Sequence, residues 1–440
     1  MMVTPRMPPH APSSSPAPAL AAETTVPVTL RKPLETSLRS GHPWIYLDAL
    51  AAPADGLRDG DVVLVRGRDR RPIGRGYWTA GSPIAVRVLT TTAGTPLPTL
   101  VRERVRAALD ERRARLAGSG TNAFRWIHGE ADLLPGIHVD LYDSVAAIRF
   151  DGAGARAFYR ELPAILLAAA AEAGGPALRA VIDRQSRAVL AGVPTAINAV
   201  VENHLRFGVD LEHGQKGGLF LDQRENREEI GRRAAGRRVL NLFGYTGGFS
   251  VYAAAGGARV TDTVDLAAPA IAAARDNFTL NQIDPRGHGF DAEDVFTFLT
   301  RARAAGQTWD IVISDPPSFA PRKSALPAAR AAYRRLHALC ATVTAAGGLF
   351  CPASCSSHFP RDEFMASVVE GVRAAGRTFD LEVLRGAGFD HPVRDWFPEG
   401  DYLKFVIGRV GAGAARAGGR RGPASSQPRP SGKRPGKMRA

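Results

Sequence analysis

Four side chains capable of chemistry stand at the ends of segments that the sequence predicts to be β-strands. They are Asp265, Asp294, Asp315 and Cys355. The β and α patterns around them alternate, which predicts a parallel sheet whose ligands bind at the carboxyl ends of its strands. Carboxylates there can accept hydrogen bonds from hydroxyl and amino groups, and a cysteine thiolate can act as a nucleophile. We therefore expect a ligand site along this edge.

The block Asp-Pro-Pro-Ser-Phe begins at Asp315, directly after the strand expected over residues 309–314. Pro316 and Pro317 remove backbone donors and fix φ, so the loop is rigid. Phe319 then offers a face on which a planar base could stack. Such a loop suits an enzyme that holds a base pulled out of its stack. A rigid turn before a helix would explain the prolines, but not an aspartate facing the cysteine across the sheet edge.

The sheet would be organised around residues 238–250, which predict a buried strand, a glycine turn and the start of a helix. Backbone N–H groups at such a turn approach a ligand closely, and the helix dipole favours an anionic group. Many nucleotide-binding domains share this arrangement, so alone it does not identify the ligand. The residues expected beside a cofactor are Phe243, Gly244, Tyr245, Thr246 and Gly247.

The chain of 440 residues is long enough for several domains. Short strands between turns predict a small β-barrel over 26–95, followed by a central α/β domain over 96–200. The alternating pattern over 201–410 predicts a Rossmann-like α/β domain. Residues 1–25 are rich in Pro, Ala and Ser, and residues 411–440 in Gly, Pro and Ser, so both ends are predicted to be disordered.

Charge and cysteine content narrow the classes of protein. The formal net charge is +14, and eight Lys and Arg residues of 411–440 have no acidic residue among them. This tail either contacts RNA electrostatically or is merely solvated, and the sequence favours neither interpretation. The sequence contains no run of 18 or more apolar residues, so no membrane span is predicted. Cys340, Cys351 and Cys355 are too few for a disulfide framework and lack zinc-finger spacing, so we expect no metal and a reducing, cytoplasmic location.

Residues 37–46 resemble the entry segment of PUA domains, which are small RNA-binding β-barrels. Within this segment, Trp44 and Tyr46 are expected to fill the barrel core rather than to stack on bases. An arginine cluster follows along a predicted hairpin, and we expect it at RNA phosphates, with a charged sheet edge as the alternative. Its members are Arg66, Arg68, Arg70, Arg71 and Arg75.

The glycine turn, the acidic strand ends, the Asp-Pro-Pro-Ser-Phe block and the Ser-Cys-Ser sequence look like class I S-adenosylmethionine-dependent methyltransferases. Further blocks in order, after a PUA-like barrel, resemble the bacterial 23S rRNA large-subunit cytosine-C5 methyltransferase family over residues 26–410. These blocks are His-Gly-Glu-Ala-Asp at 128–132, Phe-Leu-Asp-Gln-Arg at 220–224, Asp-His-Pro-Val at 390–393 and Pro-Glu-Gly-Asp-Tyr-Leu-Lys at 398–404. One departure is Ser356-Ser357-His358 after Cys355, where the best-known members read Ser-Gly. On residue chemistry alone, 129–132 would be only a turn and Asp222 a helix start.

The resemblance implies S-adenosyl-L-methionine as the cofactor. Gly244 and Gly247 would approach its methionine part, Asp265 would hold the ribose hydroxyls, and Asp294 would hold the adenine amino group. Arg224 would pair with the methionine carboxylate, although an ordinary solvated helix charge is an equally good interpretation of that arginine.

The resemblance also implies methyl transfer to C5 of a cytosine in 23S rRNA. Because C5 is a poor nucleophile, a thiolate from Cys355 would first add at C6, and Asp315 would contact the N3/N4 edge. The thiolate needs an electropositive neighbourhood, to which His358 is a candidate contributor. Pro316, Pro317 and Phe319 would contact the substrate base. The base that removes the C5 proton is not identified by the sequence.

Two other functions remain open at this point. One is an amino methyltransferase acting on an RNA purine, in which Cys355 would be incidental. The other is an RNA-binding ribosome-assembly factor without catalytic activity. A homodimer is compatible with the sequence, and no membrane partner is expected.

Overall fold

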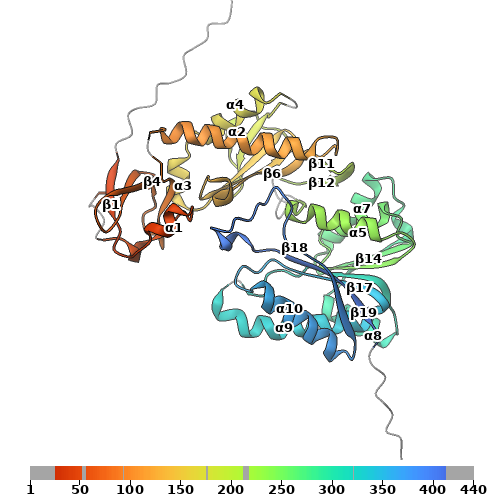
Figure 1. Cartoon of the computed structure of the whole chain (residues 1–440). Coiled ribbons are helices and arrows are strands. Elements are labelled where there is room, and N and C mark those ends of the chain that lie inside the picture. The colour runs from red at the N-terminus through yellow and green to blue at the C-terminus, as the bar shows by residue number, and fades with distance from the viewer. Residues whose placement is uncertain are drawn as a thin grey trace, which may run out of the picture.

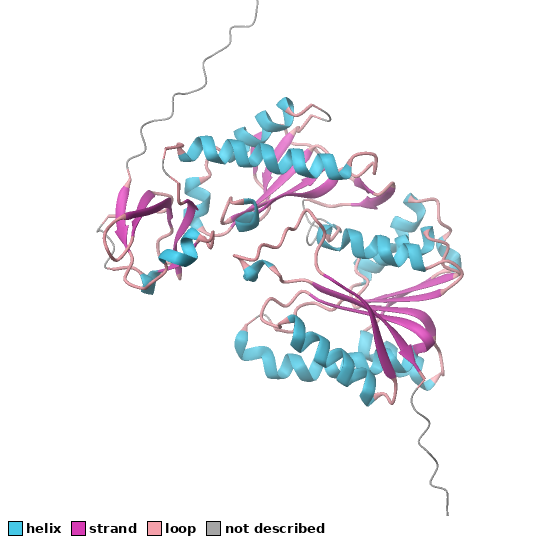
Figure 2. Ribbon diagram, viewed as in Figure 1, coloured by secondary structure: helices cyan, strands magenta, loops and turns pink. Residues whose placement is uncertain are grey.

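The computed structural model describes residues 25–51, 56–92, 94–174, 177–211, 218–320 and 322–412 (Figure 1). Nearly all of both predicted disordered ends, 1–25 and 411–440, lies outside the described residues. Three main sheets follow one another along the chain, and Figure 2 draws their strands in magenta. The α/β class predicted from the sequence is confirmed. None of the helices in these ranges has the length and apolar character needed to cross a bilayer.

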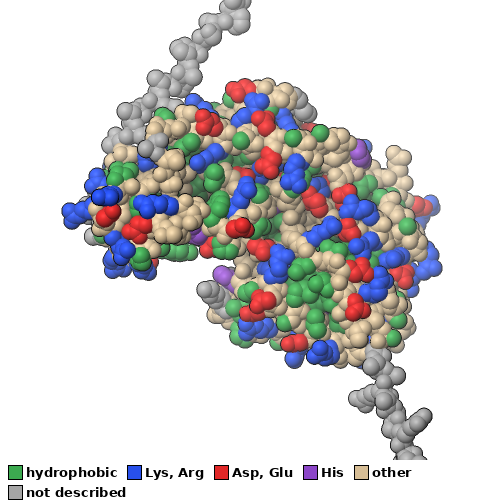
Figure 3. Space-filling model, in the orientation of Figure 1, with side chains coloured by type: hydrophobic (Ala, Val, Ile, Leu, Met, Phe, Trp, Pro, Cys, Tyr) green, Lys and Arg blue, Asp and Glu red, His purple; other side chains and the backbone are tan. Residues whose placement is uncertain are grey.

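The N-terminal sheet has the strand order β1-β3-β4-β5-β2. Its strands and helix are β1 Val26–Thr29, α1 Glu35–Arg39, β2 Trp44–Tyr46, β3 Val62–Arg66, β4 Pro72–Trp78 and β5 Ile84–Thr90. A Cβ at Gly76 would lie 2.1 Å from the Arg87 carbonyl oxygen, so β4 and β5 require glycine there. Lys and Arg side chains gather over this barrel in Figure 3. The expectation for Tyr46 was wrong: it is 44% exposed because it follows the buried Ile45 on the opposite face of β2.

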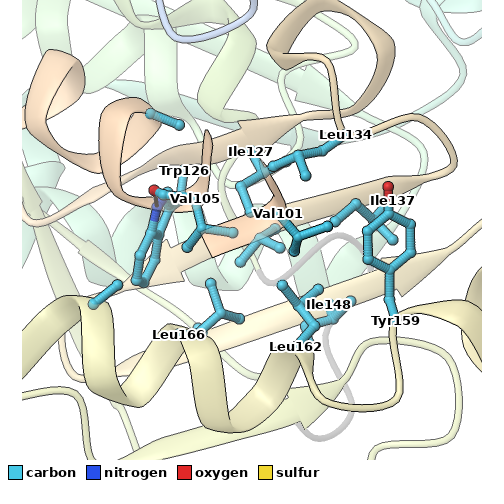
Figure 4. Close-up of a cluster of buried hydrophobic side chains, with 14 of the residues drawn as sticks. Val101, Val105, Trp126, Ile127, Leu134, Ile137, Ile148, Tyr159, Leu162 and Leu166 are labelled. Atoms are coloured by element: carbon cyan, nitrogen blue, oxygen red, sulfur yellow. Dashed lines mark hydrogen bonds between the residues drawn. The ribbon is translucent and has the colours of Figure 1, made fainter. Parts of the chain in front are cut away.

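The central sheet, of order β10-β9-β8-β7-β6, has one face covered by helices. Its elements are α2 Leu97–Leu116, β6 Ala123–His128, β7 Ile137–Tyr142, β8 Val145–Phe150, α3 Ala153–Phe158, α4 Leu162–Glu172, β9 Ala180–Asp183 and β10 Val189–Gly192. Val101 and Val105 of α2 pack on Trp126 and Ile148 in the core drawn in Figure 4. Helices α3 and α4 are separate, since Pro163 occupies the first turn of α4 and favours a new start there.

A hairpin of β11 Ala199–Glu202 and β12 Leu205–Gly208 connects the central domain to the C-terminal one. The domain boundary predicted between residues 200 and 201 therefore falls inside β11. Phe207 of the hairpin packs with Tyr142 of the central sheet and with Phe278 of the C-terminal domain. The hairpin thus contributes to a core that both domains share.

The C-terminal sheet has the order β15-β14-β13-β16-β17-β19-β18. Its strands are β13 Arg238–Leu242, β14 Val260–Asp265, β15 Gly289–Ala292, β16 Trp309–Ser314, β17 Thr344–Ser354, β18 Thr378–Arg385 and β19 Lys404–Gly411. Strands β13 to β17 are mutually parallel, and β19 is antiparallel to β17. The helices are α5 Arg224–Arg233, α6 Gly248–Ala255, α7 Ala268–Leu280, α8 Val295–Ala304, α9 Leu326–Val343 and α10 Arg361–Ala374. Helices α5 and α6 cover one face and α8, α9 and α10 the other, which is the doubly wound arrangement.

Candidate active site

The parallel strands bring the four predicted chemical side chains to one edge of the C-terminal sheet. Asp265 ends β14, Asp315 follows β16, and Cys355 follows β17. Asp294 stands between β15, which is an edge strand of the sheet, and α8. The chain adds β14 and β15 on one side of β13 and then β16 and β17 on the other, and such a topological switch point is where open α/β sheets bind ligands.

The loops that carry Asp315 and Cys355 are hydrogen-bonded to each other. Ser318 Oγ lies 2.9 Å from Ser356 Oγ, so the two loops share a polar contact. Beneath them, the hydroxyl of Tyr333 on α9 lies 2.8 Å from Ser354 Oγ and 3.3 Å from Ser356 Oγ. Burial raises the pKa of Tyr333, and the charges of Cys355 and Asp315 raise it further. Cys355 and Asp315 therefore both lie near the Tyr333 hydroxyl, on the same side of the fold.

Asp315 is oriented by Gln223, which was not among the predicted site residues. Gln223 Nε2 donates to Asp315 Oδ2 at 2.8 Å, and Gln223 Oε1 accepts from Asn226 Nδ2 at 2.7 Å. Gln223 is buried at the end of a 3₁₀ turn, Leu221–Gln223, just before α5. A buried amide with both ends bonded fixes the orientation of the carboxylate it contacts.

Lys404, rather than His358, is the cation beside the cysteine loop. Its side chain is 1% exposed, and Nζ donates to the carbonyl oxygens of Ser356 at 2.8 Å and of Tyr402 at 3.0 Å. The antiparallel register of β17 and β19 sets Lys404 opposite Ser354, one residue before Cys355. The pKa of Lys404 is lowered to about 8. Burial and the charge of Arg361 lower this pKa, while the carboxylate of Asp401 and the charge of Cys355 partly oppose them. His358 is exposed.

The predicted cofactor turn follows β13 in a strained conformation. Phe243 and Tyr245 have φ of 56° and 47°, although neither is glycine. Strain of this kind collects at ligand sites. Gly244 and Gly247 serve packing as well as approach to a ligand: a Cβ at Gly244 would lie 2.6 Å from Thr263 Cγ2, and one at Gly247 would lie 2.8 Å from Ala274 Cβ.

The carboxylate of Asp265 is held beside this turn. Oδ2 accepts from the backbone N–H of Tyr245 and Oδ1 from that of Ala267, each at 2.9 Å. Each oxygen keeps a further lone pair for a ligand hydroxyl. Thr246 is buried, and its hydroxyl donates to the carbonyl oxygen of Gly218 at 2.6 Å. A carboxylate aimed at a close-packed turn fits the ribose of an S-adenosylmethionine-like ligand.

The other predicted site residues are Asp294, at the start of α8, and three residues of the loop after Asp315. Asp294 is exposed and caps α8, with Oδ1 accepting from the backbone N–H of Thr297 at 3.0 Å, so the cap uses only one of its two oxygens. In the substrate loop, Pro316 is buried and Pro317 is exposed. Phe319 is half-buried with its ring 4.8 Å from that of Tyr333, so part of its surface is already covered.

The expectation for Arg224 was wrong. This side chain is 2% exposed, and its guanidinium donates to both oxygens of Asp390, at 3.0 and 3.1 Å, and to Glu225 at 3.0 Å. Phe389 lies against its face, with 4.9 Å from Cζ to the ring centroid. A guanidinium bonded in this way is committed to a buried ion pair and does not reach a cofactor carboxylate.

The His-Gly-Glu-Ala-Asp segment is more than a turn. Although Gly129–Asp132 forms a 3₁₀ turn, Glu130 accepts from Trp44 Nε1 of the barrel at 2.8 Å. Asp132 forms a two-pronged ion pair with Arg112 of α2, at 2.7 and 3.0 Å. The segment therefore fastens the barrel to the central domain.

A cavity of about 530 Å³ lies where the three domains meet. Its walls include Trp44 from the barrel, His128 and His138 from the central sheet, and Asp222 and Tyr402 from the C-terminal domain. Asp222 does not cap a helix as predicted; its Oδ2 accepts from the hydroxyl of Tyr402 at 2.6 Å.

No cluster of His, Cys, Asp or Glu within the described ranges is arranged to hold a metal ion. Cys340 and Cys351 are buried, and burial raises the pKa of Cys340 to about 12.

The sequence is similar to those of known methyltransferases. Residues 160–363 match a family model described as S-adenosylmethionine-dependent methyltransferase, and residues 28–91 match one described as PUA-like domain. The chain is 33% identical over 399 residues to a ribosomal RNA large subunit methyltransferase I of Alteromonas mediterranea, covering 87% of this chain and 98% of the relative. It is 36% identical over 394 residues to a ribosomal RNA large subunit methyltransferase of Deinococcus radiodurans, covering 86% and 95%.

Solved structures agree with the fold. A methyltransferase crystallised in complex with SAH is 25% identical, with a TM-score of 0.75 that covers 88% of this chain and 100% of that one. A SAM-dependent methyltransferase from Streptococcus mutans, 24% identical with the same coverage, has a TM-score of 0.74. The architecture of all three domains is therefore one that occurs in known proteins.

Proposed function

The chain belongs to the family of S-adenosylmethionine-dependent ribosomal RNA large subunit methyltransferases, and from this premise we propose that it forms 5-methylcytosine in 23S rRNA through a covalent adduct of Cys355. RNA is its partner and the PUA-like barrel its accessory RNA-binding domain. A cytoplasmic location and a homodimer stay predictions, as does an RNA contact by the tail 411–440.

The observation that carries this proposal is the convergence of a carboxylate and a thiol beside a buried cation. Asp315 and Cys355 stand on loops joined by the Ser318–Ser356 contact, and Lys404 donates to the Ser356 carbonyl. An amino methyltransferase would need the carboxylate but would have no use for a thiol supported by an ammonium group.

The residues then divide the chemistry among them. The ammonium group of Lys404 favours the thiolate of Cys355, which attacks C6 of an extruded cytosine. Asp315, oriented by Gln223, accepts from the N4 amino group and, as a carboxylic acid, donates a hydrogen bond to N3, where the attack places negative charge. Bound S-adenosylmethionine supplies an electrophilic methyl group to C5. A general base then takes the C5 proton, the electron pair of the C5–H bond re-forms the C5–C6 double bond, and the C6–S bond breaks to release the Cys355 thiolate.

Substrate and cofactor residues complete the proposal. Asp265 holds the ribose hydroxyls, and Asp294 holds the adenine amino group with the oxygen that does not cap α8. The backbone from Phe243 to Gly247, including Gly244, Tyr245 and Thr246, lies along the methionine part. Pro316, Pro317 and Phe319 form the rigid wall against the base.

Nucleoside mass spectrometry tests the proposal directly. Purified protein, S-adenosylmethionine and 23S rRNA from a strain lacking the gene should give 5-methylcytidine at one position. An N-methylated purine instead would overturn the cytosine assignment but keep the enzyme class. Absence of any methylated nucleoside together with absence of cofactor binding would favour a non-catalytic assembly factor.

Asp265→Ala should weaken S-adenosylmethionine binding by about 10- to 100-fold, because hydrogen bonds to a charged group contribute roughly 1.5–3 kcal/mol. Isothermal titration calorimetry measures the change, and thermal unfolding checks that the turn is intact. Asp284→Ala is the matched control, since Asp284 is an exposed carboxylate paired with Arg286 in the loop after α7. Equal affinities for the two variants would remove Asp265 from the cofactor site.

Lys404 should set the alkaline limb of the reaction. The wild-type methylation rate should fall as the pH rises through about 8, because the ammonium group that favours the Cys355 thiolate loses its proton there. In Lys404→Met, the apparent pKa of Cys355 should rise by about one to two units, which pH-dependent alkylation by iodoacetamide measures without RNA. Lys404→Arg keeps a charge at high pH and should abolish the decline above pH 8. An unchanged alkylation profile in Lys404→Met would refute this role.

A further inference from the structure

The open face of the central sheet lines the interdomain cavity defined above. Along β7, Ile137, Val139 and Leu141 point into the helix-covered core, whereas His138 and Asp140 belong to the cavity wall. Strand β8 alternates in the same way, with Arg149 on the cavity side and Ile148 in the core. One face of this sheet therefore builds a domain, and the other presents polar groups to a hollow closed by the two neighbouring domains. Figure 3 shows the molecule hollowed between the barrel and the C-terminal domain.

Two of the three arginines in this wall lie beside one carboxylate of the same wall. Arg125 donates to Asp140 at 2.5 Å, and Arg184 lies 3.9 Å from the same carboxylate. Burial lowers the pKa of His128 and of His138 well below the ordinary value, and nearby arginines lower both further, so both imidazoles are neutral. With five carboxylates against three arginines in its wall, and with neutral imidazoles, the interior of the cavity does not select an anion. It offers donors and acceptors to a neutral, polar ligand.

The cavity also offers aromatic faces at its rim. Phe220, Trp44, Phe397 and Tyr402 all contribute to the wall. Trp44 and Phe397 meet edge to face with 4.8 Å between their ring centroids, so the barrel and the C-terminal domain close this side together. Flat rings beside hydrogen-bonding edges are what an unstacked nucleobase requires. A volume of about 530 Å³ accommodates a ligand of nucleoside size.

Its position relates the cavity to the active site without merging the two. Ser357 lines it and is two residues from Cys355, while Asp222 lines it and adjoins Gln223, which holds Asp315. Neither Cys355 nor Asp315 is part of the wall. A base in the cavity would therefore be a neighbour of the base that reacts.

We propose that the interdomain cavity is a second base pocket, which takes one unstacked nucleobase flanking the methylated nucleotide and so selects the RNA sequence. This inference rests on the proposed function only in that the substrate is RNA. Exposed Arg149, whose guanidinium lies 3.3 Å from His138 Nδ1, stands where it can meet the phosphate of that flanking nucleotide. The pocket requires all three domains, which gives the PUA-like barrel a role in specificity as well as affinity.

Single abasic substitutions locate the occupant. The probes are oligonucleotides of the 23S rRNA segment that the enzyme methylates, each with one abasic residue at the methylated position or at one of three positions on either side. Their dissociation constants are measured with the full-length Cys355→Ala protein in the presence of S-adenosylhomocysteine. One flanking abasic substitution should weaken binding by about 5- to 100-fold, the range for loss of one stacked base.

A cavity variant combined with the abasic substitution tests whether the flanking base binds in the cavity. In a protein that also carries His138→Ala, intact RNA should bind more weakly, and the same flanking abasic substitution should have little further effect. Arg149→Ala removes a phosphate contact, which an abasic residue keeps, so this exposed variant should weaken the binding of intact and abasic RNA by a similar factor. His204→Asn removes an exposed histidine from the β11–β12 turn and should leave the abasic effect intact. Melting temperatures of all variants are compared.

Two results would overturn the second pocket. Coupling of His138 to the methylated position would mean that the cavity receives the target base, and equal binding of all flanking abasic probes would mean that it receives none. Because the probes are centred on whichever nucleotide mass spectrometry identifies, a purine target would refute cytosine C5 chemistry without affecting this test.

Discussion

Cys355→Ala is expected to abolish methyl transfer to RNA while leaving S-adenosylmethionine binding unchanged. Without a thiolate to add at C6, C5 of cytosine does not become nucleophilic, so the rate should fall by about 10⁴-fold or more. Cys355→Ser should be similarly inactive, because an unactivated hydroxyl is a far weaker nucleophile than a thiolate. Transfer of labelled methyl groups to 23S rRNA measures the loss, and calorimetry measures cofactor binding.

A covalent complex gives a second, independent readout. RNA with 5-fluorocytidine at the target should trap the wild-type protein, because a C5–F bond prevents the proton loss that releases Cys355. The complex should survive denaturing electrophoresis and should be absent from Cys355→Ala. Cys351→Ala is the matched control, since Cys351 is buried in β17 away from the loop. Turnover that persists in Cys355→Ala would instead favour methylation of an exocyclic amine.

Asp390→Ala should destabilise the protein by roughly 3–5 kcal/mol, the range for removing one partner of a buried ion pair. The carboxylate is fully buried and accepts from Arg224, from His391 Nδ1 at 3.0 Å and from the backbone N–H of Arg125 at 2.9 Å. The Asp390 carbonyl accepts from Arg112 of α2 at 3.2 Å, so the same residue joins the C-terminal and central domains. Equilibrium urea unfolding, followed by tryptophan fluorescence, measures the loss.

The pH dependence of that loss has a definite sign. His391 and Arg224 hold the pKa of Asp390 below its ordinary value, overcoming the opposing effect of burial. The stabilisation is therefore fully present above the unfolded-state pKa of about 4 and declines as the pH falls below it. Asp395→Ala, an exposed change in the same loop, should alter stability by less than about 0.5 kcal/mol. Similar losses in the two variants would mean that Asp390 is not a structural centre.

Local patterns in the sequence were sufficient for the sheet and for most of its chemical edge. Strand β16 occupies the predicted residues 309–314, and the predicted segment 238–250 contains β13, the glycine turn and the start of α6. Buried parallel strands form continuous apolar runs, and alternation with helices makes them parallel. Once the strands are parallel, their carboxyl ends share one edge. The aspartates and the cysteine at those ends are then neighbours without any knowledge of side-chain contacts.

Partner choice between distant segments could not be predicted in this way. Arg224 belongs to the recognised Phe-Leu-Asp-Gln-Arg block, yet its partner is Asp390, 166 residues away. Gln223 reaches Asp315 across 92 residues, and Lys404 approaches the Cys355 loop only through the register of β17 and β19. A charged or amide side chain has the same local pattern whether it binds a ligand, a solvent molecule or a buried counter-ion. The sequence by itself determined the strands and what stands at their ends, because those follow from local hydrophobic periodicity; only the tertiary structure decided which polar groups pair, because pairing depends on how separate domains pack and exclude water.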